Sequence, residues 1–412
     1  MNYVQSILGL LVFIGIAFLF SEDRKSVSWK KVGIAIGLQI LFALLFLKVP
    51  FLQNIFIVLN QGVLMIEKAT MAGASFMFGY LAGAPLPFNE SSKGASFIVA
   101  FRVLPIVLIM SALSSMLFHL GILQKIVKLL SKLLQRTLNI SGVQGLGVSA
   151  NVFLGIVEAP LLIKPYLLSM SRSSLFIVMT AGMSTVAGTV MVLYASIISK
   201  AIPDSLGHIL VASLVSTPAA ILIGHLFVPG RSSDEKEGEA IITIETTSIM
   251  DALVKGTMDG IQLLLSIVAM IIVLFALVHL TNQFLAFLPG GEITLEYLVS
   301  FIFIPFVWLM GISPSEVEVA ANLMSTKTVL NEFVSYQKLA SLEASDLSEK
   351  SRLVMTYAMC GFANLASLGL IVGSMGTLAP SRRSEIVGLS FKSLIAGTLA
   401  TMMTGAIVQI IL

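Results

Sequence analysis

The chain has 412 residues, of which 57% are hydrophobic and only 11% are charged. About 25% of the residues of a soluble domain are charged, so this composition excludes a soluble protein and indicates a polytopic membrane protein in contact with lipid. The net charge of +3 reflects short charged loops and gives no reason to expect a nucleic-acid polymer as partner. The single cysteine, Cys360, excludes an internal disulfide and a multi-cysteine metal site.

The first apolar run, from Ile7 to Phe20, is followed by Ser-Glu-Asp-Arg-Lys rather than by the small residues of a cleavage site. No charged residue precedes this run. We therefore expect a retained membrane span and not a cleaved signal peptide.

A helix needs about 20 apolar residues to cross the hydrocarbon core of a bilayer. Basic clusters follow the first and third candidate spans, precede the fourth and separate the last two, which favours the cytoplasmic side for these loops. Eight crossings place every cluster inside and both termini outside. The acidic loop at 231–247 is then also inside, because acidic residues weigh little in this rule. The eight stretches lie near Val4–Phe20, Val32–Phe51, Ala95–Leu120, Leu175–Ile198, Leu206–Val228, Ile261–Leu280, Met355–Met375 and Leu389–Leu412.

Two further apolar regions are too broken to be simple spans. The first runs from about Gly142 to Met170 and contains Asn151 and Glu158. The second runs from about Leu295 to Phe333 and is interrupted by Gly-Ile-Ser-Pro-Ser at 311–315. A single crossing by either region would move the following basic clusters to the outer side. We therefore predict two re-entrant hairpins, whose irregular tips are buried in protein or line water.

Each predicted hairpin is followed by two spans, which gives matching units at 142–228 and 295–412. The hairpins enter from opposite sides, so the sequence predicts an inverted repeat with a binding site near the midplane. Two amphipathic stretches, at 51–80 and 123–138, lie outside this pattern. The second has an apolar stripe and a lysine face, typical either of a helix in the cytoplasmic interface or of a loop helix packed on the protein.

Glu158 and Glu332 are the strongest candidates for a site, because a charged side chain within a membrane is expensive to bury. The alternative for each is a structural ion pair, with Lys164 for Glu158 and with Lys327 for Glu332.

Small and polar residues interrupt the fourth span at 183–189 and the seventh at 361–367. Unwound helix at these places would expose backbone carbonyls to a cation, although small residues also serve ordinary helix contacts in lipid. The four histidines have no ligand spacing and no ATP-binding motif is visible, so transport would have to be driven by an ion gradient. An intramembrane enzyme using Glu158 and Glu332 would need a nucleophile or metal motif, and a passive channel would not need two inverted hairpins.

Four segments carry a recognisable pattern: Phe-Arg-Val-Leu-Pro at 101–105, Ala-Asn-Val-Phe-Leu-Gly at 150–155 with Glu-Ala-Pro at 158–160, Thr-Lys-Thr-Val-Leu-Asn-Glu-Phe-Val at 326–334, and Cys-Gly-Phe-Ala-Asn-Leu-Ala-Ser at 360–367. Through them the chain resembles the bacterial concentrative nucleoside transporters over essentially its whole length. The resemblance implies an all-α membrane protein with eight transmembrane helices and two opposed re-entrant helical hairpins. It also implies a homotrimer in the bacterial cytoplasmic (inner) membrane.

The resemblance further implies a scaffold domain and a transport domain that moves like an elevator. Residues 1–120 would form the scaffold with spans one to three and an interfacial helix, and 229–291 would add the polar loop and span six. Residues 121–228 and 292–412 would form the two parts of the transport domain, each with one hairpin. The implied function is a symporter that imports nucleosides down a sodium gradient, with sodium as the co-transported ion and neither an organic cofactor nor ATP.

Positions in the four segments match the family's binding residues. The resemblance assigns ribose recognition to Glu332, Asn364 and Ser367, which suits the chemistry because a carboxylate accepts from two hydroxyls and an amide both donates and accepts. Phe362 and Val190 would supply apolar contacts.

The resemblance places the sodium site at Asn151, Leu154, Thr185 and Val186, where side-chain oxygens join backbone carbonyls. A proton-coupled relative is expected to lose the asparagine, so its presence favours sodium; proton coupling is the alternative.

The tip of the first hairpin departs from the family pattern. The family usually has Gly-Gln-Thr-Glu or Gly-Gln-Ser-Glu there, whereas this chain has Gly155, Ile156, Val157 and Glu158. Glu158 would lie near the base, but two polar base contacts have become aliphatic. Losing such hydrogen bonds changes discrimination strongly, so we expect a purine preference or broad selectivity.

Overall fold

The computed structural model describes residues 2–90, 96–199, 201–230, 246–287 and 293–412. Every regular element in these residues is a helix. Six helical segments are long and apolar enough to cross a membrane, which confirms a polytopic membrane protein. The first and seventh predicted spans correspond to shorter apolar helices, Tyr3–Leu19 and Leu365–Leu378, so the count of eight crossings stays a prediction. The six segments are Trp29–Lys48, Val99–His119, Arg172–Ile198, Ser205–Phe227, Ile249–Leu285 and Pro380–Ile411.

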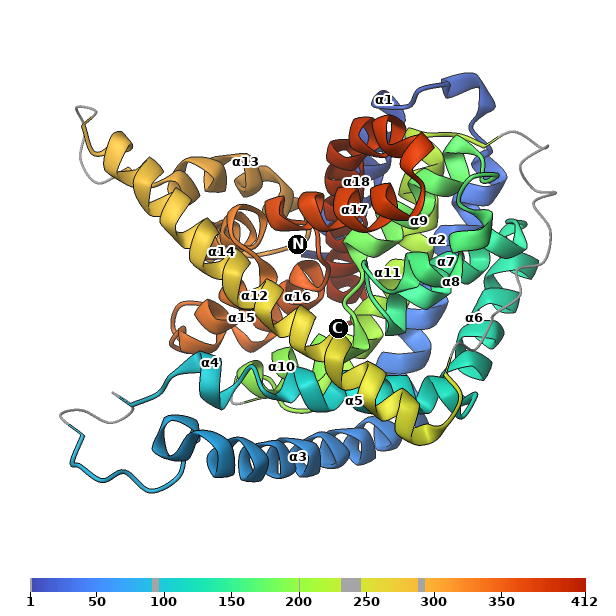
Figure 1. Cartoon of the computed structure of the whole chain (residues 1–412). Helices are drawn as coiled ribbons and strands as arrows, with labels where there is room; N and C mark the ends of the chain where they lie inside the picture. The colour runs from blue at the N-terminus through green and yellow to red at the C-terminus, as the bar shows by residue number, and fades with distance from the viewer. Residues whose placement is uncertain (1, 91–95, 200, 231–245, 288–292) are drawn as a thin grey trace.

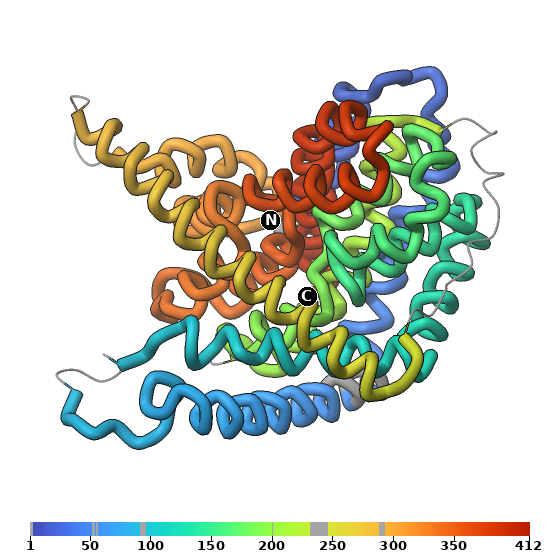
Figure 2. The backbone as a smooth tube through the Cα atoms, viewed as in Figure 1, coloured from blue at the N-terminus to red at the C-terminus, as the bar shows by residue number. Residues whose placement is uncertain are grey.

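The centre of the molecule is a bundle of helices that are apolar on all sides, as expected for helices without a solvent face. It contains α9 (Arg172–Ser184), α11 (Ser205–Phe227) and α18 (Arg383–Ile411), whose side chains are almost all buried. Helix α1 (Asn2–Leu19) packs on α18 and α2 (Trp29–Lys48) packs on α11. The two ends of the chain therefore lie side by side, as the blue and red segments in Figure 2 show.

Long helices cover the outside of this bundle. Helix α12 (Ile249–Leu285) crosses the front of the molecule diagonally, and α3 (Pro50–Phe78) runs along its lower edge (Figure 1). Helix α12 packs on α5 (Ile106–His119), which follows the short α4 (Val99–Arg102).

Two glycines allow α5 and α12 to approach closely. A Cβ at Gly256 would lie 2.7 Å from the carbonyl oxygen of Ser111, and one at Gly260 would lie 3.0 Å from the Ser111 Cβ. A small residue repeated at a four-residue interval is a common basis of tight helix pairs in membranes. The two helices therefore form one firmly joined pair.

The first predicted part of the transport domain, at 121–228, begins with α6, which confirms a helix at 123–138. Its apolar stripe packs on α7 and its lysines are exposed, while its location in a membrane interface stays a prediction. The chain leaves helical geometry after Phe153, because Gly155 has φ +87° and Pro160 then starts a new helix. The helices of this unit are α6 (Ile122–Leu138), α7 (Gly142–Phe153), α8 (Ala159–Leu162), α9, α10 (Gly188–Ile198) and α11.

The region of the second predicted hairpin contains two breaks where the sequence indicated one, and the hairpin itself stays a prediction. The interruption at 311–315 joins α13 to α14, as expected, but the chain reverses again at Leu330 and Asn331 and continues as α15 to Ser341. The run Gly-Ile-Ser-Pro-Ser is a strong signal for a turn. The second reversal involves only Leu330 and Asn331, and a single asparagine N-cap is a weak signal. The helices are α13 (Leu295–Leu309), α14 (Val317–Val329), α15 (Glu332–Ser341), α16 (Glu349–Met359), α17 (Leu365–Leu378) and α18.

Both predicted helix interruptions are confirmed. Helix α9 ends at Ser184 and α10 begins at Gly188, while α16 ends at Met359 and α17 begins at Leu365. The matching positions of these breaks in the two units agree with the predicted internal repeat, which itself stays a prediction.

Candidate functional site

The two helix breaks meet at the centre of the molecule. The backbone N–H of Phe362 donates to the carbonyl oxygen of Thr185 over 3.3 Å. A Cβ at Gly361 would lie 2.9 Å from the carbonyl oxygen of Met183, so only glycine fits this contact without displacement. The polar segments that the sequence singled out separately therefore form one junction, and the predicted site residues lie on its two sides.

Asn151 forms the centre of the cluster on the first side. This residue of α7 is 1% exposed, and its Nδ2 donates to the carbonyl oxygen of Gly147 over 2.9 Å and to that of Val178 over 3.4 Å. Its Oδ1 is buried and has no hydrogen-bond partner in the described residues. An unpaired buried oxygen is costly unless something else binds it.

The neighbours of Asn151 add further oxygen atoms. Thr185 Oγ1 donates to the carbonyl oxygen of Ala181 over 2.8 Å and lies 3.3 Å from the carbonyl oxygen of Asn151. A Cβ at Gly182 would lie only 3.1 Å from Asn151 Oδ1, so this glycine keeps space open beside the oxygen. Neutral oxygens beside unwound helix are the donor set that a hard monovalent cation requires.

Glu332 forms the centre of the cluster on the second side. Its side chain is 4% exposed and lies in the first turn of α15, after the N-cap residue Asn331. The Tyr194 hydroxyl donates to Glu332 Oε1 over 2.6 Å, and Asn364 Nδ2 donates to Oε2 over 2.7 Å. Asn364 is also the N-cap of α17, and its Oδ1 accepts from the backbone N–H and the hydroxyl of Ser367 over 2.9 and 3.1 Å. The ribose residues predicted from the resemblance thus form one hydrogen-bonded chain.

The alternative of structural ion pairs finds no direct contact in the described residues, although the buried charges of Lys327 and Glu332 are close enough to attract each other. Neither Glu158 with Lys164 nor Glu332 with Lys327 forms an ion pair there, and the Lys327 ammonium is fully buried without a hydrogen-bond partner. The half-buried carboxylate of Glu158 makes no hydrogen bond with any residue that the structure describes. Both acids therefore keep acceptor capacity for another molecule.

A cavity of about 830 Å³ lies above the junction. It brings together all eight predicted substrate residues, together with Leu154 from the predicted cation site. Asn151, Thr185 and Val186 do not line it; they lie behind its wall, where the Val186 N–H donates to Ser213 Oγ. The predicted substrate residues that line the cavity are Ile156, Val157, Glu158, Val190, Glu332, Phe362, Asn364 and Ser367.

The structure adds cavity residues that the sequence did not reveal. Tyr194 lies in an apolar helix, where a single polar residue gives no signal, and Thr189, the last residue of the interruption at 183–189, was not assigned to a site. The buried Thr189 hydroxyl has no hydrogen-bond partner in the described part of the chain. Helix α12 closes the cavity from the other side, and only tertiary structure could show this. The residues of α12 in the wall are Leu263, Ser266, Ile267 and Met270.

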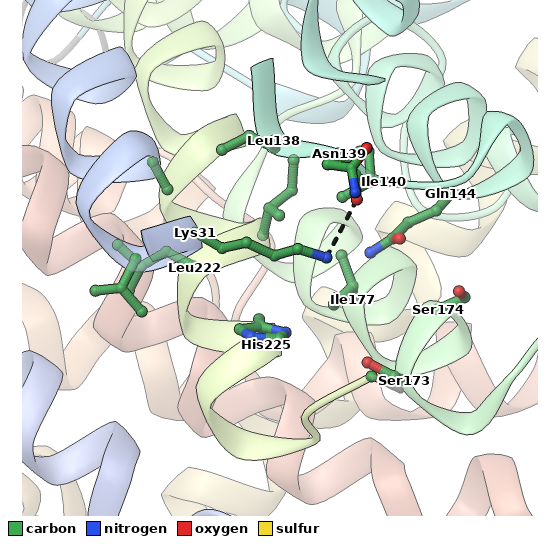
Figure 3. A pocket seen from close by; sticks show the side chains of 14 residues that line it. Lys31, Leu138, Asn139, Ile140, Gln144, Ser173, Ser174, Ile177, Leu222 and His225 are labelled. Atoms are coloured by element: carbon green, nitrogen blue, oxygen red, sulfur yellow. Dashed lines mark hydrogen bonds between the residues drawn. The ribbon is translucent and has the colours of Figure 1, made fainter. Parts of the chain in front are cut away.

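A separate cavity of about 490 Å³ lies near the ends of α2, α9 and α11 (Figure 3). Lys31 reaches across it, and its Nζ donates to the carbonyl oxygen of Asn139 over 3.1 Å. None of the predicted site residues lines this cavity, so it is not part of the candidate site.

Comparisons with known proteins agree with this geometry. Family models match the chain as the "Na+ dependent nucleoside transporter N-terminus" at 8–81, "Nucleoside recognition" at 100–201 and the "Na+ dependent nucleoside transporter C-terminus" at 208–409. An uncharacterized transporter of Haemophilus influenzae is 36% identical, over 99% of this chain and 97% of that protein.

Solved structures extend the similarity to the whole fold. The protein CNTnw in an inward-facing, substrate-bound state has a TM-score of 0.90 and 31% identity, covering 100% of this chain and 98% of that one. A variant of CNTnw in an outward-facing state has a TM-score of 0.89 and 29% identity with the same coverage. This chain therefore belongs to the Na+-dependent concentrative nucleoside transporters, a family of membrane transporters and not of enzymes.

Proposed function

We propose that this chain imports nucleosides across the bacterial cytoplasmic membrane and that Na+ moving down its gradient drives the import. One observation carries the proposal: the oxygen cluster around Asn151 and the hydrogen-bonded cluster around Glu332 meet at a single junction, beneath one cavity. A coupled carrier needs this proximity, because the ion has to change the affinity for the cargo.

The Glu332 cluster has the chemistry for a ribose. A carboxylate has about four lone-pair positions, and Tyr194 and Asn364 use one on each oxygen, so acceptor capacity remains for two sugar hydroxyls. Ser367 adds a hydroxyl at the same place. Val190 and Phe362 line the cavity beside this group and offer apolar contact to a planar base.

The Asn151 cluster supports Na+ as the driving ion. Its oxygens come from Asn151, Thr185 and the backbone near Leu154 and Val186, and no group of three or more His, Cys, Asp or Glu residues lies together in the described residues. The side-chain contacts that the structure describes at this place involve neutral oxygens, which suit Na+ better than a proton. The ion is substrate here, taken up and released in each cycle.

Movement is proposed to follow the elevator mechanism. The cavity lies between α12 and the segments that form the two predicted hairpins, so a slide of the latter along α12 would carry the cargo across the membrane. Relatives captured in inward-facing and outward-facing states support such alternation.

The assembly and the domain boundaries are part of the same proposal. A homotrimer with both termini outside, a scaffold at 1–120 and 229–291 and a transport domain at 121–228 and 292–412 follow the family resemblance. The contacts of α1 with α18 and of α2 with α11 then lie between the proposed scaffold and the proposed transport domain.

Base preference is proposed to be purine or broad. Ile156 and Val157 line the cavity where the family usually has polar residues, so the wall there cannot hydrogen-bond the edge of a pyrimidine. Thr189 Oγ1 is a buried polar atom in this wall that remains available.

Uptake of radiolabelled adenosine and uridine into proteoliposomes tests the proposal, with Na+ and pH gradients imposed separately. We expect accumulation against a gradient with Na+ alone. We also expect Asn151→Ala to raise the Na+ concentration for half-maximal uptake at least tenfold while leaving the adenosine-to-uridine ratio unchanged. Accumulation driven only by a pH gradient would favour proton coupling, and equilibration without accumulation would favour a channel. Strong selectivity for uridine would contradict the base assignment.

A further inference from the structure

A second polar cavity adjoins the first. It encloses about 810 Å³ between α5, the first half of α12 and the segment after α7, and it shares Leu154 and Glu158 with the first cavity. The cavity lies beside the C-terminal half of α5 and the N-terminal half of α12. In the proposed orientation, these two halves face the cytoplasm. A molecule leaving the first cavity past Glu158 would enter this space.

The wall of the second cavity contains free hydrogen-bonding groups. Ser111, Ser114 and Ser115 of α5 line it, and in the described residues none of their hydroxyls has a hydrogen-bond partner. Serine hydroxyls in helices usually bond to a carbonyl of the preceding turn, so three without a partner on one face are unusual. Ser111 is only 4% exposed as a residue, yet its hydroxyl is not among the buried atoms without a partner, so the hydroxyl is accessible from the cavity. The unpaired carboxylate of Glu158 faces the same cavity.

The charges of this wall select the class of ligand. Asp259 of α12 also lines the cavity and is close enough to Glu158 for the two carboxylates to repel each other. Lys255 lines the cavity too, and both Lys255 and Asp259 take part in further interactions, so Glu158 is the acidic group left for a ligand. A phosphate would meet two acidic residues here, whereas a neutral molecule with several hydroxyl and amino groups can hydrogen-bond to Glu158 and to the serines.

We propose that this cavity is a second nucleoside site, occupied after the cargo leaves the Glu332 cluster and before it reaches the cytoplasm. The inference depends on the proposed function, because it takes the nucleoside as cargo. Glu158 belongs to both sites and passes the nucleoside from one to the other. The pairing of α5 and α12 through Gly256 and Gly260 keeps the serine face in place during this transfer.

Protection of introduced cysteines tests the site. Cys360 is fully buried, so a polar thiol reagent will report mainly on a new cysteine, with the unmodified chain as the blank. Ser114→Cys reports on the second cavity, and Ser266→Cys on α12 reports on the first. Both are made with Glu332 intact and with Glu332→Gln, which weakens the first site about 10- to 100-fold, and the adenosine concentration is chosen to fill the first site only when Glu332 is intact. We expect adenosine at this concentration to slow labelling at position 114 at least threefold in both backgrounds, but at position 266 only with Glu332 intact.

Two results would overturn the inference. One is loss of protection at position 114 in the Glu332→Gln background, and the other is equal protection by adenosine and adenosine monophosphate. The transport rate gives an independent test with the variant S111A/S114A/S115A. We expect its kcat to fall about threefold or more while adenosine affinity at the first site stays unchanged. An unchanged kcat would contradict the inference. If the unmodified chain accumulates nucleoside but adenosine does not slow labelling at position 114, only the assignment of the second site is wrong. If the unmodified chain does not accumulate nucleoside, the proposed function is wrong.

Discussion

Glu332 is oriented by two neighbouring side chains, Tyr194 and Asn364, each of which donates to a different carboxylate oxygen. A buried carboxylate without such donors would be unstable, since an unpaired charge in a low-dielectric environment is costly. The same two hydrogen bonds fix the directions of the remaining lone pairs. At the scale of single residues, the proposed recognition of the ribose therefore depends on the preorganisation of one acid.

Glu332→Gln should reduce nucleoside affinity by about 10- to 100-fold, because hydrogen bonds to a charged group contribute about 1.5–3 kcal/mol. Every nucleoside should be affected alike, since all share the ribose. Equilibrium binding of adenosine and uridine measures this loss. Glu318→Gln changes an exposed carboxylate of α14 and serves as the control; an equal loss in both variants would remove Glu332 from the site.

Tyr194→Phe should raise the KM for nucleosides about fivefold with little change in kcat, because it removes one hydrogen bond of about 1 kcal/mol from Glu332 Oε1. Tyr336→Phe is the matched control, as this buried tyrosine stacks near Tyr194 but donates to the carbonyl oxygen of Thr356. Equal effects of the two substitutions would point to packing rather than to orientation of the acid.

The helices that carry the site are held in register by contacts between their breaks. Gly361 approaches the backbone of Met183 and Ser184 so closely that the break of one unit determines the position of the other. Loss of this contact would separate the Asn151 and Glu332 clusters.

Gly361→Ala should abolish uptake and lower the unfolding temperature in detergent, because its Cβ would lie 2.9 Å from backbone atoms that cannot move independently. Gly369→Ala in α17 meets no atom within 4 Å and should leave stability unchanged or raise it by up to about 1 kcal/mol. Normal uptake by the Gly361 variant would show that the junction tolerates displacement.

The sequence predicted the helix breaks and the polar residues beside them, because charged and amide groups within apolar runs are conspicuous. It also located the tip at Gly155, where a glycine and a proline coincide. The reversal at Leu330 and Asn331 was missed, because only two residues form it and neither is a glycine or a proline. The α12 wall and the hydrogen bond from Tyr194 depend on tertiary contacts, which no local pattern encodes.

At the scale of the whole molecule, an ion network ties the beginning of the chain to its end. Glu22, in the loop after α1, lies 2.9 Å from Arg172 Nη2 and 2.7 Å from Lys392 Nζ. Arg172 also contacts Glu385, and Arg382 joins the same carboxylate. The network connects α1, α9 and α18 at one surface.

The Arg172 guanidinium, helped by Lys392, lowers the pKa of Glu22 from 4.5 to about 2, against the opposing effect of partial burial. The ionised form therefore stabilises the folded state at neutral pH, and this contribution is lost as the pH falls from 4.5 toward 2. Glu22→Gln should lower the unfolding temperature at pH 7, with the difference from the unmodified chain shrinking by more than half at pH 3. Glu349→Gln, on the exposed start of α16, is the control. A difference that persists unchanged at pH 3 would contradict the assignment.

The single hydrogen bond from the Phe362 N–H to the Thr185 carbonyl has a consequence for energetic efficiency. If the Asn151 cluster binds Na+ and the Glu332 cluster binds the nucleoside, as proposed, then this hydrogen bond and the close contact of Gly361 join the two sites, and a displacement of one displaces the other. A fixed ratio of ions to nucleosides would then depend on the junction of the two interrupted helices. A variant with a damaged junction would lose this coupling before either site lost its own affinity.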